Sequence, residues 1–340
     1  MLKKLFKYFI AKHSRKEQVI SSGDMQEAQK IFFAVFSRYG DGIISFKVIR
    51  EFIGLYPDKQ YLLFTTSQLV PYAREILGEN VEFVGVNKRN PFSLVPSLLK
   101  LKNFDADLGF NPWSHGDDAE FFVSFAKKYS IFKRFRQWGK SYNLYARVRE
   151  YLILESKTLP KTISHSQKDV KNIVLVPFST DITKSLDKEM TKQLIEKLKE
   201  LYKDAKITIC GFRDELGGMD GLQKFYFSKS SSDEFLKLLK SSDLFVGVDA
   251  GPLHIANTIG IKTIGIFGPT APETIVDFDW DIIIIRDASL YGIFCCALIC
   301  KYPVCIKSTV GTFVTIGLQS DLKEATDVCM GSINKGKEIE

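Results

Sequence analysis

The sequence lacks any apolar run near the roughly 18 residues that a membrane-spanning helix needs. No signal peptide is predicted at its start either, because lysine and arginine interrupt every apolar stretch there. The chain has only 6 cysteines among 340 residues, too few for a disulfide scaffold. These absences predict a soluble protein of the reduced cytosol.

Two phosphate-binding signatures are also missing. The chain contains neither GxGxxG nor GxxxxGK[ST], which argues against a dinucleotide oxidoreductase and against a P-loop NTPase. The late cysteines do not have the spacing of a zinc site; they are Cys295, Cys296, Cys300, Cys305 and Cys329. We therefore expect no metal and no cofactor.

What is present is a globular composition, with 45% hydrophobic and 26% charged residues. A chain of 340 residues predicts two domains of roughly 150 residues each. The stretch 154–171 is polar and has no periodicity, as a linker should. We therefore expect an N-terminal domain over residues 1–160 and a C-terminal domain over residues 161–340.

Both halves alternate strands with helices, which predicts an α/β fold of two Rossmann-like parallel sheets. In the first half we expect a buried strand, a Gly-Asp-Gly turn, an amphipathic helix and a second strand over 30–66, a helix over 93–101, and strands over 81–87 and 105–111. In the second half we expect strands over 172–180, 205–212, 243–249 and 262–268, and helices over 188–202, 232–242 and 251–260. Open α/β folds bind ligands at the carboxyl ends of their strands, so we expect the active site between the domains.

The net charge of +7 is concentrated at the N-terminus. The first 20 residues carry six basic side chains and one acidic one, a net +5. Apolar residues recur among them at helical spacing, which indicates either a basic amphipathic helix for an anionic membrane surface or a solvated tail. A second basic and aromatic stretch, 121–142, suits nucleic acid less well, because no recognition motif accompanies it.

The segment VDAGPLH over residues 248–254 predicts a strand end, a tight turn and the start of a helix. Gly251 allows the tight turn, and Pro252 suits the first helical position. The free amides of that first turn would attract a phosphate, with His254 pointing back over the same site. The alternative is a core histidine at position 254 and a simple N-cap at Asp249.

Two further side chains are candidates for chemistry. Asp41 lies between two glycines, where its carboxylate is either a general base for a hydroxyl or the cap of the helix that follows. Lys184 follows the first strand of the second half, where it would neutralise a leaving diphosphate or would simply be a surface lysine.

Together these motifs resemble glycosyltransferase family 9, the ADP-heptose:lipopolysaccharide heptosyltransferases. The strongest similarity is D-x-G-x-x-H-[IL]-A at 249–256, followed by F-G-P-T-x-P at 267–272. The family's N-terminal S-x-x-G-D resembles 37–41, and its S-x-x-K segment resembles the stretch from Ser179 or Thr180 to Lys184. The resemblance runs, with gaps, from about Ile31 to Met330.

The resemblance implies a GT-B fold with no essential metal and an inverting transfer of heptose from ADP-heptose to a lipid A–core saccharide. It implies an acceptor-binding N-terminal domain, a donor-binding C-terminal domain, and a peripheral location on the cytoplasmic face of the inner membrane. Asp41 would then be the general base and Lys184 would hold the diphosphate. The implied donor-binding residues are Thr180, Glu215, Asp249, Ala250, Gly251, Pro252, Leu253 and His254.

The sequence departs from the family at three places. SLDKE stands at 185–189 where the family usually has a W-P pair, and Pro252 replaces a residue that is often polar or small. The family's loop glutamate has two counterparts here, Asp214 and Glu215. Three alternatives therefore stay open: transfer of a different sugar, a nucleotide-sugar 2-epimerase, and a non-catalytic protein that binds a nucleotide or saccharide.

Overall fold

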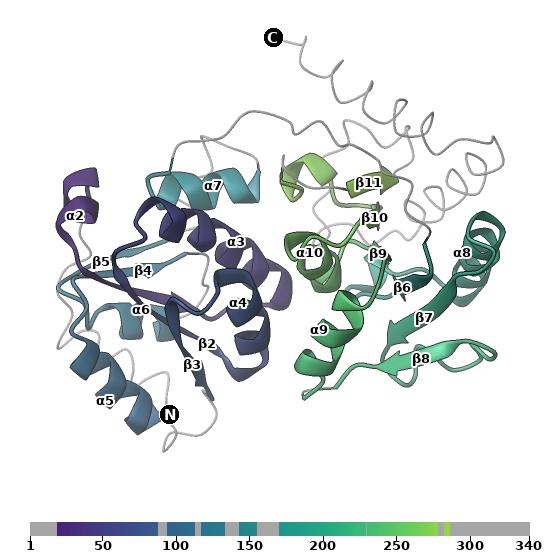
Figure 1. Ribbon diagram of the computed structural model, residues 1–340, viewed down its shortest axis with the longest axis horizontal. Helices are drawn as coiled ribbons and strands as arrows, with labels where there is room; N and C mark the ends of the chain where they lie inside the picture. Colours follow the sequence, from purple (N-terminus) through teal and green to yellow (C-terminus); the bar gives the residue numbers. More distant parts are fainter. Residues whose placement is uncertain are drawn as a thin grey trace, which may run out of the picture. The chain divides into compact units, whose positions relative to one another are not determined.

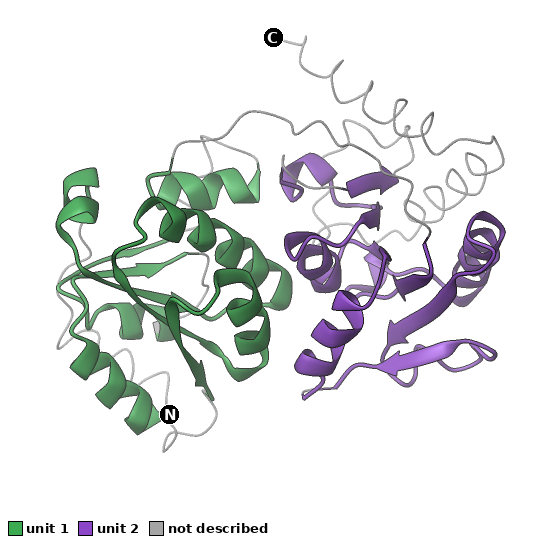
Figure 2. Ribbon diagram, viewed as in Figure 1, with its two compact units in different colours: residues 1–158 green, residues 159–340 purple. Residues whose placement is uncertain are grey.

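The computed structural model describes residues 19–87, 94–112, 117–132, 143–154, 170–228, 230–277 and 282–285. The chain divides into two compact units, residues 1–158 (unit 1) and residues 159–340 (unit 2), shown in Figure 2. Three predicted features lie outside the described residues: all but the last two of the 20 N-terminal residues, most of the linker, and the five late cysteines.

Unit 1 holds a parallel sheet whose described strands have the order β3-β2-β1-β4-β5 (Figure 1). The strands are β1 Lys30–Val35, β2 Gln60–Thr66, β3 Val81–Val86, β4 Leu108–Asn111 and β5 Lys128–Ile131. The helices are α2 Ser22–Glu27, α3 Tyr39–Leu55, η1 Ser67–Leu69, α4 Val70–Leu77, α5 Leu94–Phe104, α6 Asp117–Val123 and α7 Leu144–Tyr151.

Aromatic side chains fill the core on both faces of this sheet. On one face Phe33 of β1 packs edge-on against Phe52 of α3, with ring centroids 5.7 Å apart. On the other face Phe64 of β2 packs against Phe122 of α6, with centroids 5.5 Å apart. Because β1 is buried on both faces, it reads as a continuous apolar run, which is typical of a central parallel strand.

Unit 2 holds a second parallel sheet, with the described strands in the order β11-β10-β9-β6-β7-β8. The strands are β6 Asn172–Val176, β7 Lys206–Gly211, β8 Gln223–Tyr226, β9 Leu244–Val248, β10 Thr263–Ile266 and β11 Ile282–Ile285. The helices are η3 Ile182–Lys184, α8 Lys188–Leu201, α9 Ser232–Lys240, α10 Gly251–Thr258 and η4 Pro272–Thr274.

Each sheet has one point where the strand order reverses. In unit 1 the chain runs outward from β1 to β2 and β3, then returns to β4 on the other side of β1. In unit 2 it runs outward from β6 to β7 and β8, then returns to β9 on the other side of β6. Such switch points are where open α/β sheets bind ligands, so the loops after β1, β4, β6 and β9 are the ones to search.

Every strand and helix predicted from the sequence is present, but two details of the first half are wrong. Gly40, Asp41 and Gly42 do not form a turn, because they lie in the first turn of α3. The helix is also not simply amphipathic, since the eight residues Gly42–Ile49 are all buried. Gly42 serves a close contact there: a Cβ at this position would lie 2.9 Å from Leu69 Cδ1.

The described part of the basic stretch 121–142 is folded into α6 and β5. Lys127 Nζ lies 2.8 Å from Asp107 Oδ1, and Lys128 Nζ lies 2.5 Å from Asp24 Oδ1. These lysines are paired with carboxylates and do not form a free basic surface. Residues 133–142 lie outside the described residues.

Candidate active site

The loop after β6 holds Lys184 in a network of short-range hydrogen bonds. The Asp181 side chain accepts from the Thr183 amide at 3.0 Å and so caps η3. The Ser179 amide donates to Ser185 Oγ at 2.9 Å, which ties the two ends of the loop together. Thr180, predicted to touch the donor, is exposed in this loop. These hydrogen bonds therefore fix the backbone of the loop that carries Lys184.

Lys184 forms an ion pair with Asp249, the residue that follows β9. The two loops meet because β6 and β9 are neighbours at the switch point of unit 2. The Lys184 side chain is 20% exposed, whereas that of Asp249 is only 5% exposed. A ligand that approaches from solvent would thus meet the ammonium group, with the carboxylate shielded behind it.

His254 completes this cluster from the second turn of α10. Its Nε2 atom lies 3.9 Å from Asp249 Oδ1, which is too far for a hydrogen bond but close enough for electrostatic interaction. Burial alone would raise the pKa of Asp249, but the Lys184 ammonium and the neighbouring His254 hold that pKa well below its usual range. Asp249 is therefore an anion at every physiological pH, and it anchors two potential cations.

The start of α10 differs from the predicted amide cradle. Its N-cap is Ala250, so the alternative in which Asp249 caps the helix is wrong. Pro252 has no N–H, and the Leu253 amide donates to the Ala250 carbonyl oxygen at 3.0 Å. Within Gly251–Leu253 this leaves the Gly251 amide as a donor for an anion. The positive charge available to an anion near the start of α10 therefore comes mainly from Lys184. The backbone amides contribute less than the sequence predicted.

Glu215 lies in the loop after β7, the strand on the other side of β6. Its Oε2 atom accepts from the Phe212 amide at 2.7 Å, and this bond closes the turn at the strand end. Asp214, the other candidate, is exposed. The carboxyl ends of three adjacent strands, β9, β6 and β7, therefore carry Asp249, Lys184 and Glu215 respectively.

Asp41 occupies the switch point of unit 1, in the first turn of α3. The N-cap of α3 is Arg38, so the alternative in which Asp41 caps this helix is wrong. Ser45 Oγ lies 2.9 Å from the Asp41 carbonyl oxygen and 3.1 Å from that of Pro112, which joins α3 to the end of β4. Among the described residues, no hydrogen bond or ion pair reaches the Asp41 carboxylate. The partly buried carboxylate is thus available to accept a proton.

Sequence reasoning missed Asn111, the last residue of β4. It is 1% exposed, and neither Oδ1 nor Nδ2 has a hydrogen-bond partner among the described residues. Ser37 Oγ, in the segment between β1 and α3, is likewise buried without a partner. A polar residue that ends a central strand is the signal that would have pointed to Asn111.

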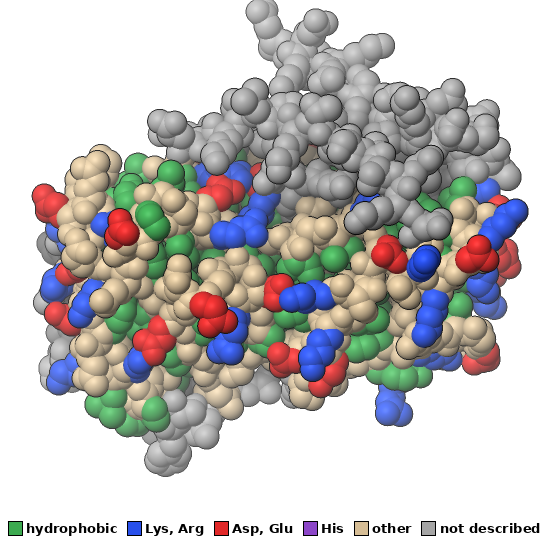
Figure 3. All heavy atoms as spheres, in the orientation of Figure 1, with side chains coloured by type: hydrophobic (Ala, Val, Ile, Leu, Met, Phe, Trp, Pro, Cys, Tyr) green, Lys and Arg blue, Asp and Glu red, His purple; other side chains and the backbone are tan. Residues whose placement is uncertain are grey.

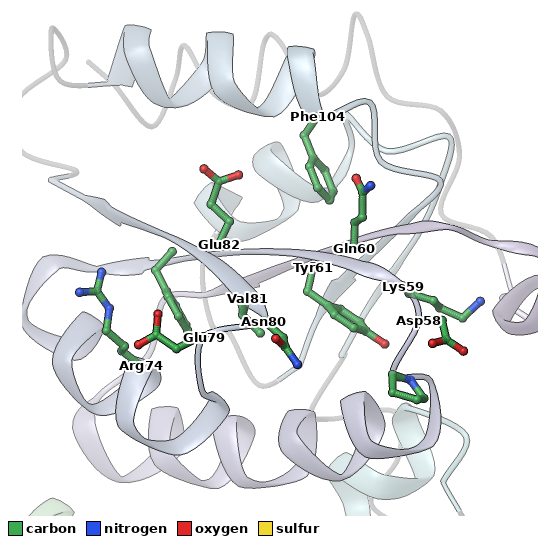
Figure 4. A pocket seen from close by; sticks show the side chains of 12 residues that line it. Asp58, Lys59, Gln60, Tyr61, Arg74, Glu79, Asn80, Val81, Glu82 and Phe104 are labelled. Carbon is green, nitrogen blue, oxygen red and sulfur yellow. The ribbon is translucent and has the colours of Figure 1, made fainter.

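A separate hollow in unit 1 lies at the amino ends of β2 and β3, away from the switch point (Figure 4). It encloses about 840 Å³ and is lined by charges of both signs, among them Lys59, Arg74 and Glu82. Lys59 donates to the Gln26 carbonyl oxygen at 3.0 Å, Arg74 lies over the Phe83 ring, and Glu82 pairs with Lys100. These three charges already have partners within the unit, and the hollow lies at the opposite end of the strands from the switch point.

No group of three or more His, Cys, Asp and Glu side chains in the part of the chain that the structure describes is arranged to hold a metal ion. In the same residues every helix is too short or too polar to span a bilayer.

Comparisons with known proteins agree with this fold. The sequence model of Glycosyltransferase family 9 (heptosyltransferase) matches residues 128–286. The structure of E. coli ADP-heptose LPS heptosyltransferase II matches with a TM-score of 0.58 at 15% identity, over 85% of this chain and 99% of that chain. E. coli heptosyltransferase WaaC with ADP matches with a TM-score of 0.53 at 13% identity, over 75% of this chain and 92% of that one.

A glycosyltransferase family 9 protein from Veillonella parvula matches with a TM-score of 0.57 at 13% identity, over 84% of this chain and 97% of that chain. Searched by sequence, the curated proteins contain no match. The structural matches confirm the predicted α/β class, with two Rossmann-like sheets as in GT-B heptosyltransferases. The family-model match, over residues 128–286, confirms the predicted resemblance to glycosyltransferase family 9 (heptosyltransferase).

Proposed function

We propose that the protein transfers a heptose from ADP-heptose to a saccharide of a lipopolysaccharide or lipooligosaccharide core, with inversion at the anomeric carbon. The observation that carries the proposal is the cluster of Lys184, Asp249 and His254 at the switch point of unit 2. A partly exposed lysine backed by a buried carboxylate suits a diphosphate leaving group. The names of two structural matches, an ADP-heptose heptosyltransferase and WaaC with ADP, support ADP as the nucleotide.

In this proposal Lys184 binds the donor directly and Asp249 acts through it. A lysine ammonium has three N–H donors, so Lys184 can keep its ion pair and still donate to a phosphate oxygen. Asp249 is too deeply buried to meet the donor itself, and its role is to position Lys184 and His254. The amide of Gly251, the turn through Ala250, Pro252 and Leu253, and the side chains of Thr180 and Glu215 complete the proposed donor site. No metal is required.

Asp41 is the proposed general base. Its carboxylate takes the proton of the acceptor hydroxyl while that oxygen bonds to the anomeric carbon of the heptose. The bond from that carbon to the diphosphate breaks on the opposite face, and the leaving ADP carries its charge toward Lys184. In this division of labour residues 1–160 bind the acceptor and residues 161–340 bind the donor. A lipid-anchored acceptor would require the enzyme to work at the cytoplasmic face of the inner membrane.

The test compares ADP, UDP, GDP and CDP as stabilisers of the wild-type chain in a thermal-shift assay. Binding at about 100 times the dissociation constant adds roughly 2.7 kcal/mol, so the correct nucleotide should raise the melting temperature visibly. Lys184→Met should remove the shift, whereas Lys188→Met, an exposed lysine at the start of α8, should keep it. Stabilisation by UDP alone would overturn the ADP-heptose assignment.

Product analysis separates transfer from the alternatives. With ADP-heptose and a heptose-deficient core saccharide, ADP should appear together with an extended saccharide. With donor alone, an epimerised nucleotide sugar would indicate a 2-epimerase. Nucleotide binding without any product under either condition would indicate a binding protein.

A further inference from the structure

Helix α5 exposes apolar side chains on its solvent-facing side. Its buried residues, Leu94, Ser97 and Leu101, pack toward the core of unit 1. On the opposite side Val95 is 54% exposed and Leu99 is 57% exposed, four residues apart and hence on the same face of the helix. Figure 3, in the orientation of Figure 1, shows hydrophobic side chains at the lower left, where Figure 1 labels α5. A helix that packs only one face against its own domain would normally carry polar residues on the other.

The polar residues beside this face are basic. Residues 83–104 contain four cations, at 88, 89, 100 and 102, and no aspartate or glutamate. Lys100 pairs with Glu82 of β3, whereas Lys102 is exposed in the last turn of α5. The Glu82 carboxylate is thus neutralised by Lys100. The next acid along the chain, Asp105, lies beyond the helix, with its Oδ2 atom 3.6 Å from Lys127 Nζ. The α5 face, defined here as Val95, Pro96, Leu99, Lys102 and Asn103, is therefore apolar and carries only positive charge.

We infer that the α5 face docks on an anionic lipid surface, with Val95 and Leu99 entering the interface and Lys102 contacting headgroups. Apolar residues on one side of a helix flanked by lysines are the signature of interfacial binding, and positive charge complements anionic lipid. The inference rests on the proposed function, because a lipid-anchored acceptor is what would bring a glycosyltransferase to a membrane. It assigns a role to described residues of unit 1 that is independent of the first 20 residues.

The test uses the full-length chain and vesicles of phosphatidylglycerol mixed with phosphatidylcholine. The fraction of protein that sediments with the vesicles gives the partition coefficient. Val95→Asp/Leu99→Asp should lower this coefficient about tenfold, because two apolar contacts are lost and two negative charges are added. The matched control is Leu55→Asp/Ile153→Asp, which changes two exposed apolar residues of unit 1 by the same charge. The control should sediment like the wild type. Equal partition of the two double variants would overturn the inference.

A second arm separates this inference from the proposed function. Transfer to a delipidated core saccharide should be the same for wild type and Val95→Asp/Leu99→Asp, while transfer to the acceptor embedded in vesicles should fall about tenfold for the variant. Absence of transfer by the wild type to either acceptor would refute the proposed function without affecting the sedimentation result. Equal activity of variant and wild type on the embedded acceptor would refute the docking surface without affecting the proposed function.

A second copy of the chain is the other occupant that the α5 face allows. Light scattering coupled to size exclusion, without lipid, tests it. The wild type and Val95→Asp/Leu99→Asp should have the same molar mass. A dimer that the substitutions dissociate would show that α5 is an interface between copies and would overturn the lipid assignment.

Discussion

The polar groups at the two switch points differ: those of unit 2 are paired with each other, whereas those of unit 1 are not. In unit 2 the loops after β6 and β9 bring a lysine and an aspartate together, so both charges are compensated within the unit. In unit 1 the helix after β1 carries the Asp41 carboxylate and β4 ends in the Asn111 amide, and neither group has a partner among the residues that the structure describes. The same topology thus supports a preassembled charged cluster in one unit and unsatisfied groups in the other. A compensated cluster suits binding of an anion, whereas an unpaired carboxylate suits proton transfer.

The largest expected effect comes from removing the charge of Asp41. Asp41→Asn should lower kcat by about 10² to 10⁴, because an amide of the same shape cannot accept the proton of the acceptor hydroxyl. Affinity for ADP, measured by calorimetry, should not change, and the melting temperature should change little because no ion pair is lost. The assay is ADP release in the presence of acceptor.

Asp58→Asn is the matched control for this prediction, since Asp58 is exposed at the opposite end of the sheet in unit 1. Its kcat should equal that of the wild type. If Asp41→Asn also retained full kcat, the unpaired carboxylate of unit 1 would have no role in catalysis, and the contrast between the two switch points would lose its functional meaning.

Unit 2 should respond in stability as well as activity. Lys184→Met leaves the Asp249 carboxylate buried without its cation, and such breaking of a buried pair typically costs about 3–5 kcal/mol. Urea unfolding at pH 7 measures the loss. Adding Asp249→Asn to Lys184→Met should restore much of the stability, because no charge then remains buried.

The pH dependence of that loss has a defined sign. In the wild type the pKa of Asp249 is held below its ordinary value of 3.8, so its stabilising contribution is complete above that pH and is lost on further acidification. Without Lys184, burial would raise the pKa of the same carboxyl instead, and protonation would then relieve the penalty. The stability gap between wild type and Lys184→Met should therefore narrow as pH falls toward 4. A gap that stays constant from pH 8 to pH 4 would show that the pair is not the cause.

Asn111 should behave in the opposite way to Lys184. Within the described part of the chain its side-chain amide has no hydrogen-bond partner. Asn111→Leu therefore gives up no bond and removes a desolvation penalty of about 1–3 kcal/mol, part of which the larger side chain offsets by crowding. We expect the free energy of unfolding in urea to stay equal or to rise by about 1 kcal/mol. A decrease of more than that would reveal an unseen partner of the amide, such as an ordered water molecule, and would weaken the contrast between the units.

Sequence reasoning found the central strands and the helices beside them, but not the contacts that join them. The segment from β9 into α10 was predictable because an apolar run, a glycine and a proline mark its boundaries. The pairing of Lys184 with Asp249 was not, because it spans 65 residues and depends on β6 and β9 being neighbours. Gly40 and Gly42 predicted a turn because glycine disfavours helix interiors, yet close packing against Leu69 requires Gly42 within α3. The sequence analysis did not predict the strands β5, β8 and β11 or the helices α2, α4, α6 and α7.

The smallest expected effect concerns the partly exposed pair of Lys128 and Asp24 in unit 1, which is the counterpart of the buried pair in unit 2. Hydrogen bonds from Lys128 and from the Ser21 backbone lower the pKa of Asp24 to about 2. A carboxylate with a lowered pKa stabilises the fold above its ordinary value of 3.8, and this contribution disappears as pH falls toward 2. Lys128→Gln should therefore move the Asp24 titration, followed by NMR, upward toward 3.8. Because the Lys128 side chain is 45% exposed and solvent screens this pair, the free energy of unfolding at pH 7 should change far less than in Lys184→Met. Equal losses in the two variants would mean that burial does not distinguish the two pairs.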